Sequence, residues 1–133
     1  LSISTPTSMN LGTAVAGDMK IYEMDTITVT DGRGLGVGWV VSVIASALTN
    51  TTVGNTIIPT AMGYTSGAFL NSGSGSVTMV ATDQINLTGA VPVATASLAS
   101  GSFSVTWTPE FTLAIPIAAA NGIYTGSITH SVA

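Results

Sequence analysis

The sequence contains no cysteine, so disulfide bonds and thiol chemistry contribute nothing to this chain. Charge is also scarce, because only 6% of the 133 residues are charged and the only cations are Lys20 and Arg33. Two isolated cations cannot form the basic patch that binding to nucleic acids or anionic lipids requires. No apolar run reaches the roughly 18 residues of a membrane span. We therefore expect no nucleic-acid partner and no membrane span.

What replaces the missing charges is mostly serine, threonine, glycine and alanine. The hydrophobic fraction of 46% is ordinary for a folded domain, so we expect residues 1–133 to fold as one domain. The chain starts at Leu1 and shows no signal-peptide pattern, which predicts that a leader has been removed. The expected location is therefore extracellular, at the cell surface.

Apolar and polar residues alternate with a period of two along several segments, which predicts half-buried β-strands. The clearest case is residues 102–108, where Phe103, Val105 and Trp107 share one face. Residues 94–100 are expected to form a short helix or nothing regular. Loops or hairpin ends are predicted at residues 50–55 and 65–76, and strands at residues 1–5, 26–30, 37–44, 77–82, 102–108, 111–117 and 123–132.

This succession of short strands and turns predicts an all-β fold of two packed antiparallel sheets. We expect a β-sandwich, Ig-like or jelly-roll-like, with a partly closed barrel as the neighbouring alternative.

Two segments resemble the WxL family of bacterial cell-surface domains, which are named for Trp-x-Leu motifs. Residues 27–43 resemble the family's strand, its Asp-x-Arg-Gly turn and its Gly-Trp-x-Leu strand, with Val41 in place of the leucine. Residues 113–132 are similar to its C-terminal strand pair, with His130 and Val132 at the second triplet, and residues 1–15 to its N-terminal strand. The resemblance implies non-covalent cell-wall binding and a structural turn at Asp31, Arg33, Gly38 and Trp39.

The only histidine, His130, lies beside Ser131, and a serine next to a histidine raises the question of nucleophilic catalysis. Neighbouring residues of a strand point to opposite faces, which separates the two side chains. We therefore interpret His130 as a partly buried structural residue on the face of Tyr124 and Ile128. With nucleophilic and charged groups so scarce, we expect no enzyme and no cofactor.

Glycines recur through residues 32–38, but a β-branched run follows them where a phosphate-binding loop needs a helix. We interpret this segment as a turn that an Asp31–Arg33 pair braces and that lets Trp39 pack closely. The one local group of acids is Asp18, Glu23 and Asp25, whose spacing does not match a calcium loop, so we expect no metal site.

Exposed aromatic side chains could bind sugars, and Trp39, Trp107 and Tyr124 are the candidates. Their strand parity matches the buried sets, so we interpret them as core residues. Asn50 and Asn86 each begin an acceptor pattern for N-glycosylation.

The low charge favours a structural protein that associates with copies of itself, because a monomer usually carries more charge to stay soluble. The chain begins with an alternating segment that could add to the sheet edge of another copy and so build a pilus-like filament. This assembly element comprises Leu1, Ser2, Ile3, Ser4 and Thr5. The alternative is a WxL-type module that binds cell-wall peptidoglycan.

Overall fold

The computed structural model describes residues 1–34 and 36–133 and consists of short strands with one 3-10 helix, η1 (Pro59–Ala61). None of the helical structure in these residues is long and apolar enough to cross a membrane. The strands are β1 (Ser2–Ser4), β2 (Met19–Glu23), β3 (Ile27–Asp31), β4 (Trp39–Ala45), β5 (Leu48–Asn50), β6 (Asn55–Ile57), β7 (Met62–Thr65), β8 (Leu70–Gly73), β9 (Ser76–Ala81), β10 (Val91–Ser100), β11 (Phe103–Trp107), β12 (Glu110–Ala114) and β13 (Ile128–Val132).

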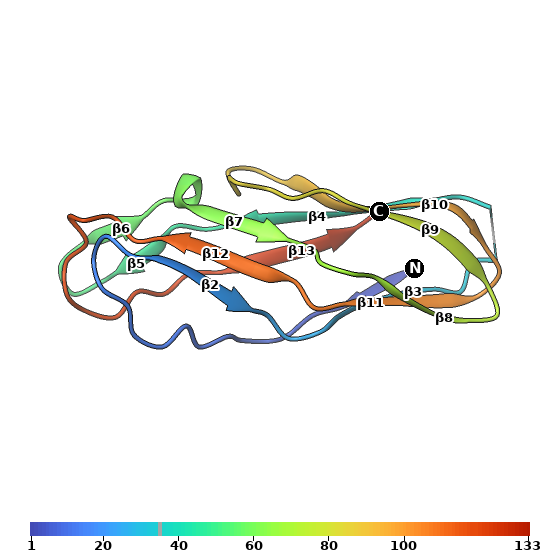
Figure 1. Cartoon of the computed structure of the whole chain (residues 1–133), viewed down its shortest axis with the longest axis horizontal. Coiled ribbons are helices and arrows are strands. Elements are labelled where there is room, and N and C mark those ends of the chain that lie inside the picture. The colour runs from blue at the N-terminus through green and yellow to red at the C-terminus, as the bar shows by residue number, and fades with distance from the viewer. Residues whose placement is uncertain (35) are drawn as a thin grey trace.

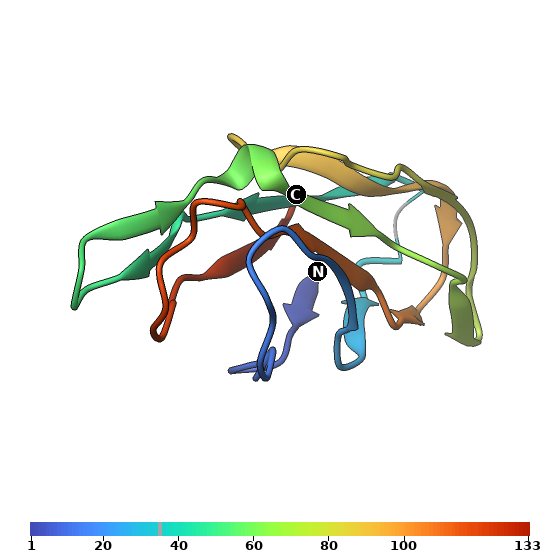
Figure 2. The ribbon, with the colours of Figure 1, turned by 60° about the vertical axis from the view of Figure 1, so that its left-hand side comes forward.

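The strands form two layers, which confirms the predicted all-β sandwich (Figures 1 and 2). The first layer joins two antiparallel sheets end to end, in the orders β1-β3-β11-β8 and β2-β12-β7. The two sheets are continuous because β2 leads directly into β3 and β11 leads directly into β12. Where these two connections pass each other, the Met24 amide donates a 2.8 Å hydrogen bond to the Pro109 carbonyl. The second layer is the sheet β13-β4-β10-β9, which the β5–β6 hairpin extends at one end.

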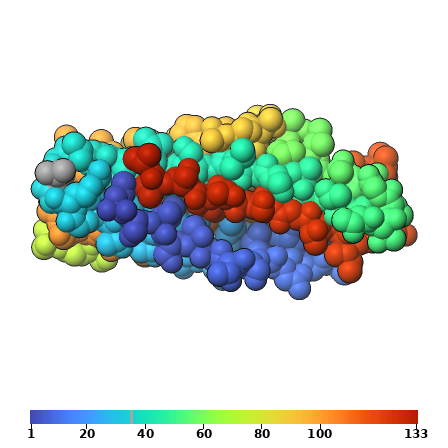
Figure 3. Space-filling view, turned by 180° about the vertical axis from the view of Figure 1, so that it is seen from behind, coloured from blue at the N-terminus to red at the C-terminus, as the bar shows by residue number. Residues whose placement is uncertain are grey.

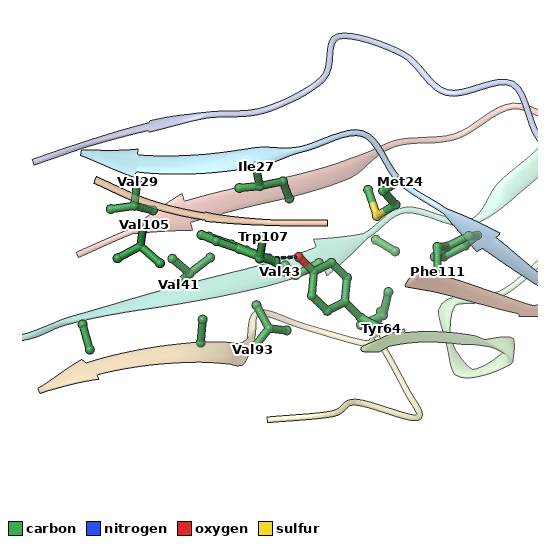
Figure 4. Close-up of a cluster of buried hydrophobic side chains, with 14 of the residues drawn as sticks. Met24, Ile27, Val29, Val41, Val43, Tyr64, Val93, Val105, Trp107 and Phe111 are labelled. Atoms are coloured by element: carbon green, nitrogen blue, oxygen red, sulfur yellow. Dashed lines mark hydrogen bonds between the residues drawn. The ribbon is translucent and has the colours of Figure 1, made fainter. Parts of the chain in front are cut away.

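Alternation along the strands places one face of each layer in a shared core (Figure 4). In β4, Trp39, Val41, Val43 and Ala45 are buried, while the residues between them are exposed or half-buried. Strand β11 repeats this pattern with Phe103, Val105 and Trp107, as the sequence predicts. The buried side chains form one contiguous cluster that includes residues from both layers.

The prediction for residues 94–100 is wrong, because they belong to β10, one of the core strands of the second layer. The register of β10 shifts between Pro92 and Ala94 against β4, and between Ser97 and Ser100 against β9. Each shift breaks the alternation of inward and outward residues, so the period-two signal is lost.

Other boundaries also differ from the prediction. The sequence predicts none of the strands β2, β5, β6 and β7, and β8 lies inside residues 65–76, which it predicts to be a loop. The predicted strand 111–117 ends at Ala114, and the predicted strand 123–132 begins at Ile128. Residues 115–117 and 123–127 lie outside the regular ladders of β12 and β13, and the one residue among them that pairs with a strand is Thr125, through an isolated bridge to Thr49 of β5. The pattern alone therefore overstates their pairing.

Candidate functional site

The N-terminal strand β1 lies at an edge of the first layer, where it pairs only with β3. The pairing is antiparallel and sets Ser2 opposite Thr30 and Ile3 opposite Val29. Ile3 is half-buried and packs against the core, whereas Ser2 is exposed on the outer face. The predicted strand 1–5 thus forms over its three central residues.

Residues 5–14, which we call the tether, connect β1 to the rest of the domain. Among the described residues, no backbone hydrogen bond joins the tether to any strand. Its own turn is local, with the Gly12 amide donating to the Asn10 side chain over 2.8 Å. Met9 and Leu11 pack against the core as half-buried side chains. Side-chain packing without backbone pairing holds this segment weakly.

A groove of about 1030 Å³ lies beneath the tether. It opens between the two layers, beside β2 and β13, and Figure 3 shows the N-terminal segment running alongside β13 on that surface. The walls are mainly apolar and aromatic, and Asp25 is their only acidic residue among those described. The lining includes Tyr22, Met24, Phe111, Leu113, Tyr124 and His130.

His130 lies in the wall of the groove and contacts a buried pair of aromatic residues. The indole Nε1–H of Trp107 donates to the Tyr64 hydroxyl over 3.1 Å, and the same hydroxyl lies 3.2 Å from His130 Nε2. Burial raises the pKa of Tyr64, so the hydroxyl keeps its proton and can donate it to Nε2. His130 is then the neutral tautomer with its proton on Nδ1.

Burial also lowers the pKa of His130 to about 4, which favours the neutral ring. Ser131 is exposed on the opposite face of β13, so serine and histidine do not meet. The pattern of β13 correctly places His130 on its inward face. Tyr64 is a partner that no local pattern could reveal, because it is 66 residues away in the sequence.

The turn after β3 is braced by a two-point ion pair between Asp31 and Arg33. Arg33 Nε and Nη2 each donate to a different carboxylate oxygen over 2.9 Å, and the Asp31 side chain is 2% exposed. These hydrogen bonds from Arg33 hold the pKa of Asp31 at about 2. A Cβ at Gly38 would collide with the carbonyl oxygen of Ala96, so this position needs glycine. Trp39 follows in the core.

The remaining candidates do not gather into one site. Within the described residues, no three His, Cys, Asp or Glu side chains lie together, and Asp18 instead pairs with Lys20 at 3.5 Å. Glu23 and Asp25 are exposed. Of the aromatic candidates, Trp39 and Trp107 are buried, while the half-buried Tyr124 donates its hydroxyl proton to Asn55 or to the Ala120 carbonyl.

The two glycosylation candidates differ in exposure. Asn50 is 1% exposed, and its amide donates to the Asn121 carbonyl while its oxygen accepts from the Thr52 amide. Asn86 is exposed at the surface. In the folded domain only Asn86 of the two presents its side chain to solvent.

No protein-family model, curated protein or solved structure matches this chain. Function has to be argued from the geometry of the strand, its tether and the groove.

Proposed function

We propose that this chain is a non-enzymatic structural subunit of an extracellular surface filament or layer, assembled by exchange of its N-terminal strand. The attachment of β1 is the observation that carries the proposal. This strand pairs over three residues with one neighbour, and the tether behind it makes no backbone hydrogen bond to a strand among the described residues. Releasing β1 therefore breaks few interactions.

Exchange lets β1 of one copy pair with β3 of the next in the register of the closed form. Ile3 would pack beside Val29 in both forms, so the strand's contacts are the same within a chain and between chains. The ten residues of the tether can extend over about 33 Å, enough to reach a neighbouring copy. Each copy gives one strand and accepts one, which produces an open, head-to-tail polymer.

The outer face of the β1-β3-β11-β8 sheet supports close association because it carries hydroxyls in place of charges. One row across the sheet consists of Ser2, Thr30, Ser104 and Ser72, aligned by the strand register. Thr30 and Ser104 already bond to each other through their hydroxyls over 3.1 Å. Such a face adds no charge repulsion between neighbouring subunits.

Deleting residues 1–8 tests this function by negative-stain electron microscopy and sedimentation at high protein concentration. We expect filaments from the intact chain and none from the deletion. Ile3→Asp places a charge on the packed face of β1 and should also prevent assembly, whereas Ser4→Asp places it on the exposed face and should not. Unchanged filaments from the deletion, or an intact chain that stays monomeric, would rule strand exchange out.

The alternative function is a WxL-type module that binds cell-wall peptidoglycan. The groove favours it, since it presents two half-buried tyrosines, Tyr22 and Tyr124, in a mainly uncharged setting that suits a sugar polymer. Co-sedimentation with purified cell walls tests this idea. Binding that Tyr22→Ala weakens would support it, and absence of binding would end it.

A further inference from the structure

Strand β9 has a free edge at the side of the second layer. It is the last strand of its sheet and pairs only with β10. The Thr82 amide donates to the Val93 carbonyl over 2.9 Å, which fixes which residues face β10. In an antiparallel ladder, successive residues point their backbone N–H and C=O groups alternately towards and away from the neighbouring strand. The groups that point away from β10 are those of Val77, Met79 and Ala81. They form a row of free donors and acceptors.

This edge lacks the charges and the proline that keep many sheet edges from pairing. Proteins protect free edges with charged side chains, proline or bulges. Strand β2, an edge of the first layer, carries Lys20 and Glu23. Strand β9 has neither charge nor proline, and the sequence has no charged residue from 34 to 82. Short, uncharged segments of high β-propensity are those that add to other strands.

A second feature beside this edge is an exposed, strained leucine. Leu98 lies in the bulge of β10 next to β9, has a backbone φ of 52° and is 79% exposed. Positive φ is unfavourable for a bulky side chain, and the exposed position adds no burial to offset it. Val80 on β9 is also 54% exposed. Both side chains would gain burial if another sheet joined at β9.

We propose that β9 pairs with β9 of a second copy about a two-fold axis, joining two second layers edge to edge. An axis at Met79 sets Val77 opposite Ala81 of the second copy, so the free groups of both edges bond to one another. Side chains on the same face stay on the same face, and Val80 and Leu98 of both copies line one side of the joined sheet. This contact uses no residue of β1 or the tether, so it goes beyond strand exchange and would link filaments in pairs.

The test measures the mass of the full-length chain by sedimentation equilibrium, in the Ile3→Asp background that blocks strand exchange. We expect a species of twice the 13.3 kDa monomer mass. Ala81→Pro removes one free N–H that makes no bond within the sheet, and Thr78→Lys adds a charge to the exposed edge. Each should weaken dimerisation about tenfold or more, which corresponds to about 1.4 kcal/mol. Thr30→Lys, on the outer face of the other layer, should leave the dimer intact.

Thermal unfolding shows whether each variant is folded. A folded Ala81→Pro or Thr78→Lys chain that dimerises as tightly as its parent would overturn the β9 contact, as would a parent that is monomeric at every concentration. Loss of filaments with Ile3→Asp while these dimers persist supports both proposals. Dimers from an intact chain that forms no filaments would retain this contact and reject strand exchange.

Discussion

His130 makes the stability of this domain depend on pH. An unfolded histidine titrates near pH 6.5, but burial lowers the pKa of His130 to about 4 in the folded protein. Folding therefore favours the neutral ring. Its contribution to stability is complete above pH 6.5 and is lost as the pH falls towards 4.

The size of this effect follows from the two pKa values. Between pH 7.5 and 5 the linkage amounts to about 2 kcal/mol, and water in the adjoining groove reduces it to about 1–2 kcal/mol. Protonation would also place a hydrogen on Nε2, where the Tyr64 hydroxyl lies 3.2 Å away and already accepts from Trp107. Once protonated, Nε2 could no longer accept the hydrogen bond that the Tyr64 hydroxyl donates to it.

Urea unfolding at pH 7.5 and pH 5 measures this difference, on a chain that carries both Ile3→Asp, to prevent strand exchange, and Thr78→Lys, to weaken the β9 contact. His130→Gln is the comparison, because its amide oxygen can still accept from Tyr64 but does not titrate. We expect the parent to lose about 1–2 kcal/mol more than the glutamine variant over this interval. Equal losses in the two proteins would refute the assignment of His130 as a half-buried residue that stays neutral.

Three further predictions concern the packing around the site. Tyr64→Phe leaves the buried indole N–H beneath it unpaired, so urea unfolding should show a loss of about 2 kcal/mol. Gly38→Ala drives a Cβ into the backbone of β10 and should cost about 1–3 kcal/mol, whereas Gly32→Ala, with open space around it, should change the unfolding free energy little. Arg33→Gln should raise the pKa of Asp31 from about 2, and an NMR titration of the carboxylate checks this.

The sequence predicts the fold well wherever a strand is regular and buried on one face. Residues 102–108 show this, since the alternation of Phe103, Val105 and Trp107 is also the pattern of burial in β11. Strand β10 was missed because its two register shifts interrupt the alternation. Periodicity describes one strand at a time, so irregular pairing with a neighbour is invisible to it.

The candidate site was predictable only in part for a related reason. The inward face of His130 follows from the parity of its strand, but its contact with Tyr64 depends on the meeting of distant segments. Likewise, the alternation of residues 1–5 predicts a strand but not its pairing with β3. The scarcity of charge is plain in the sequence, whereas the fact that β9 is an edge emerges only from the order of strands in the sheet.

Strand exchange is tested most directly by a disulfide that only two chains together can form. The chain has no cysteine of its own, so a Ser2→Cys protein mixed with a Thr30→Cys protein contains one thiol per chain. These positions lie opposite each other in the β1–β3 ladder, within the geometry that a disulfide needs. Ser2→Cys mixed with Ser72→Cys, at the far edge of the same sheet, is the control.

After mild oxidation, non-reducing electrophoresis separates linked chains from single chains. Strand exchange predicts a disulfide-linked pair from the Ser2→Cys and Thr30→Cys mixture, well above the amount in the control. If that mixture yields no more linked chains than the control, β1 stays on its own domain and the proposed assembly is wrong.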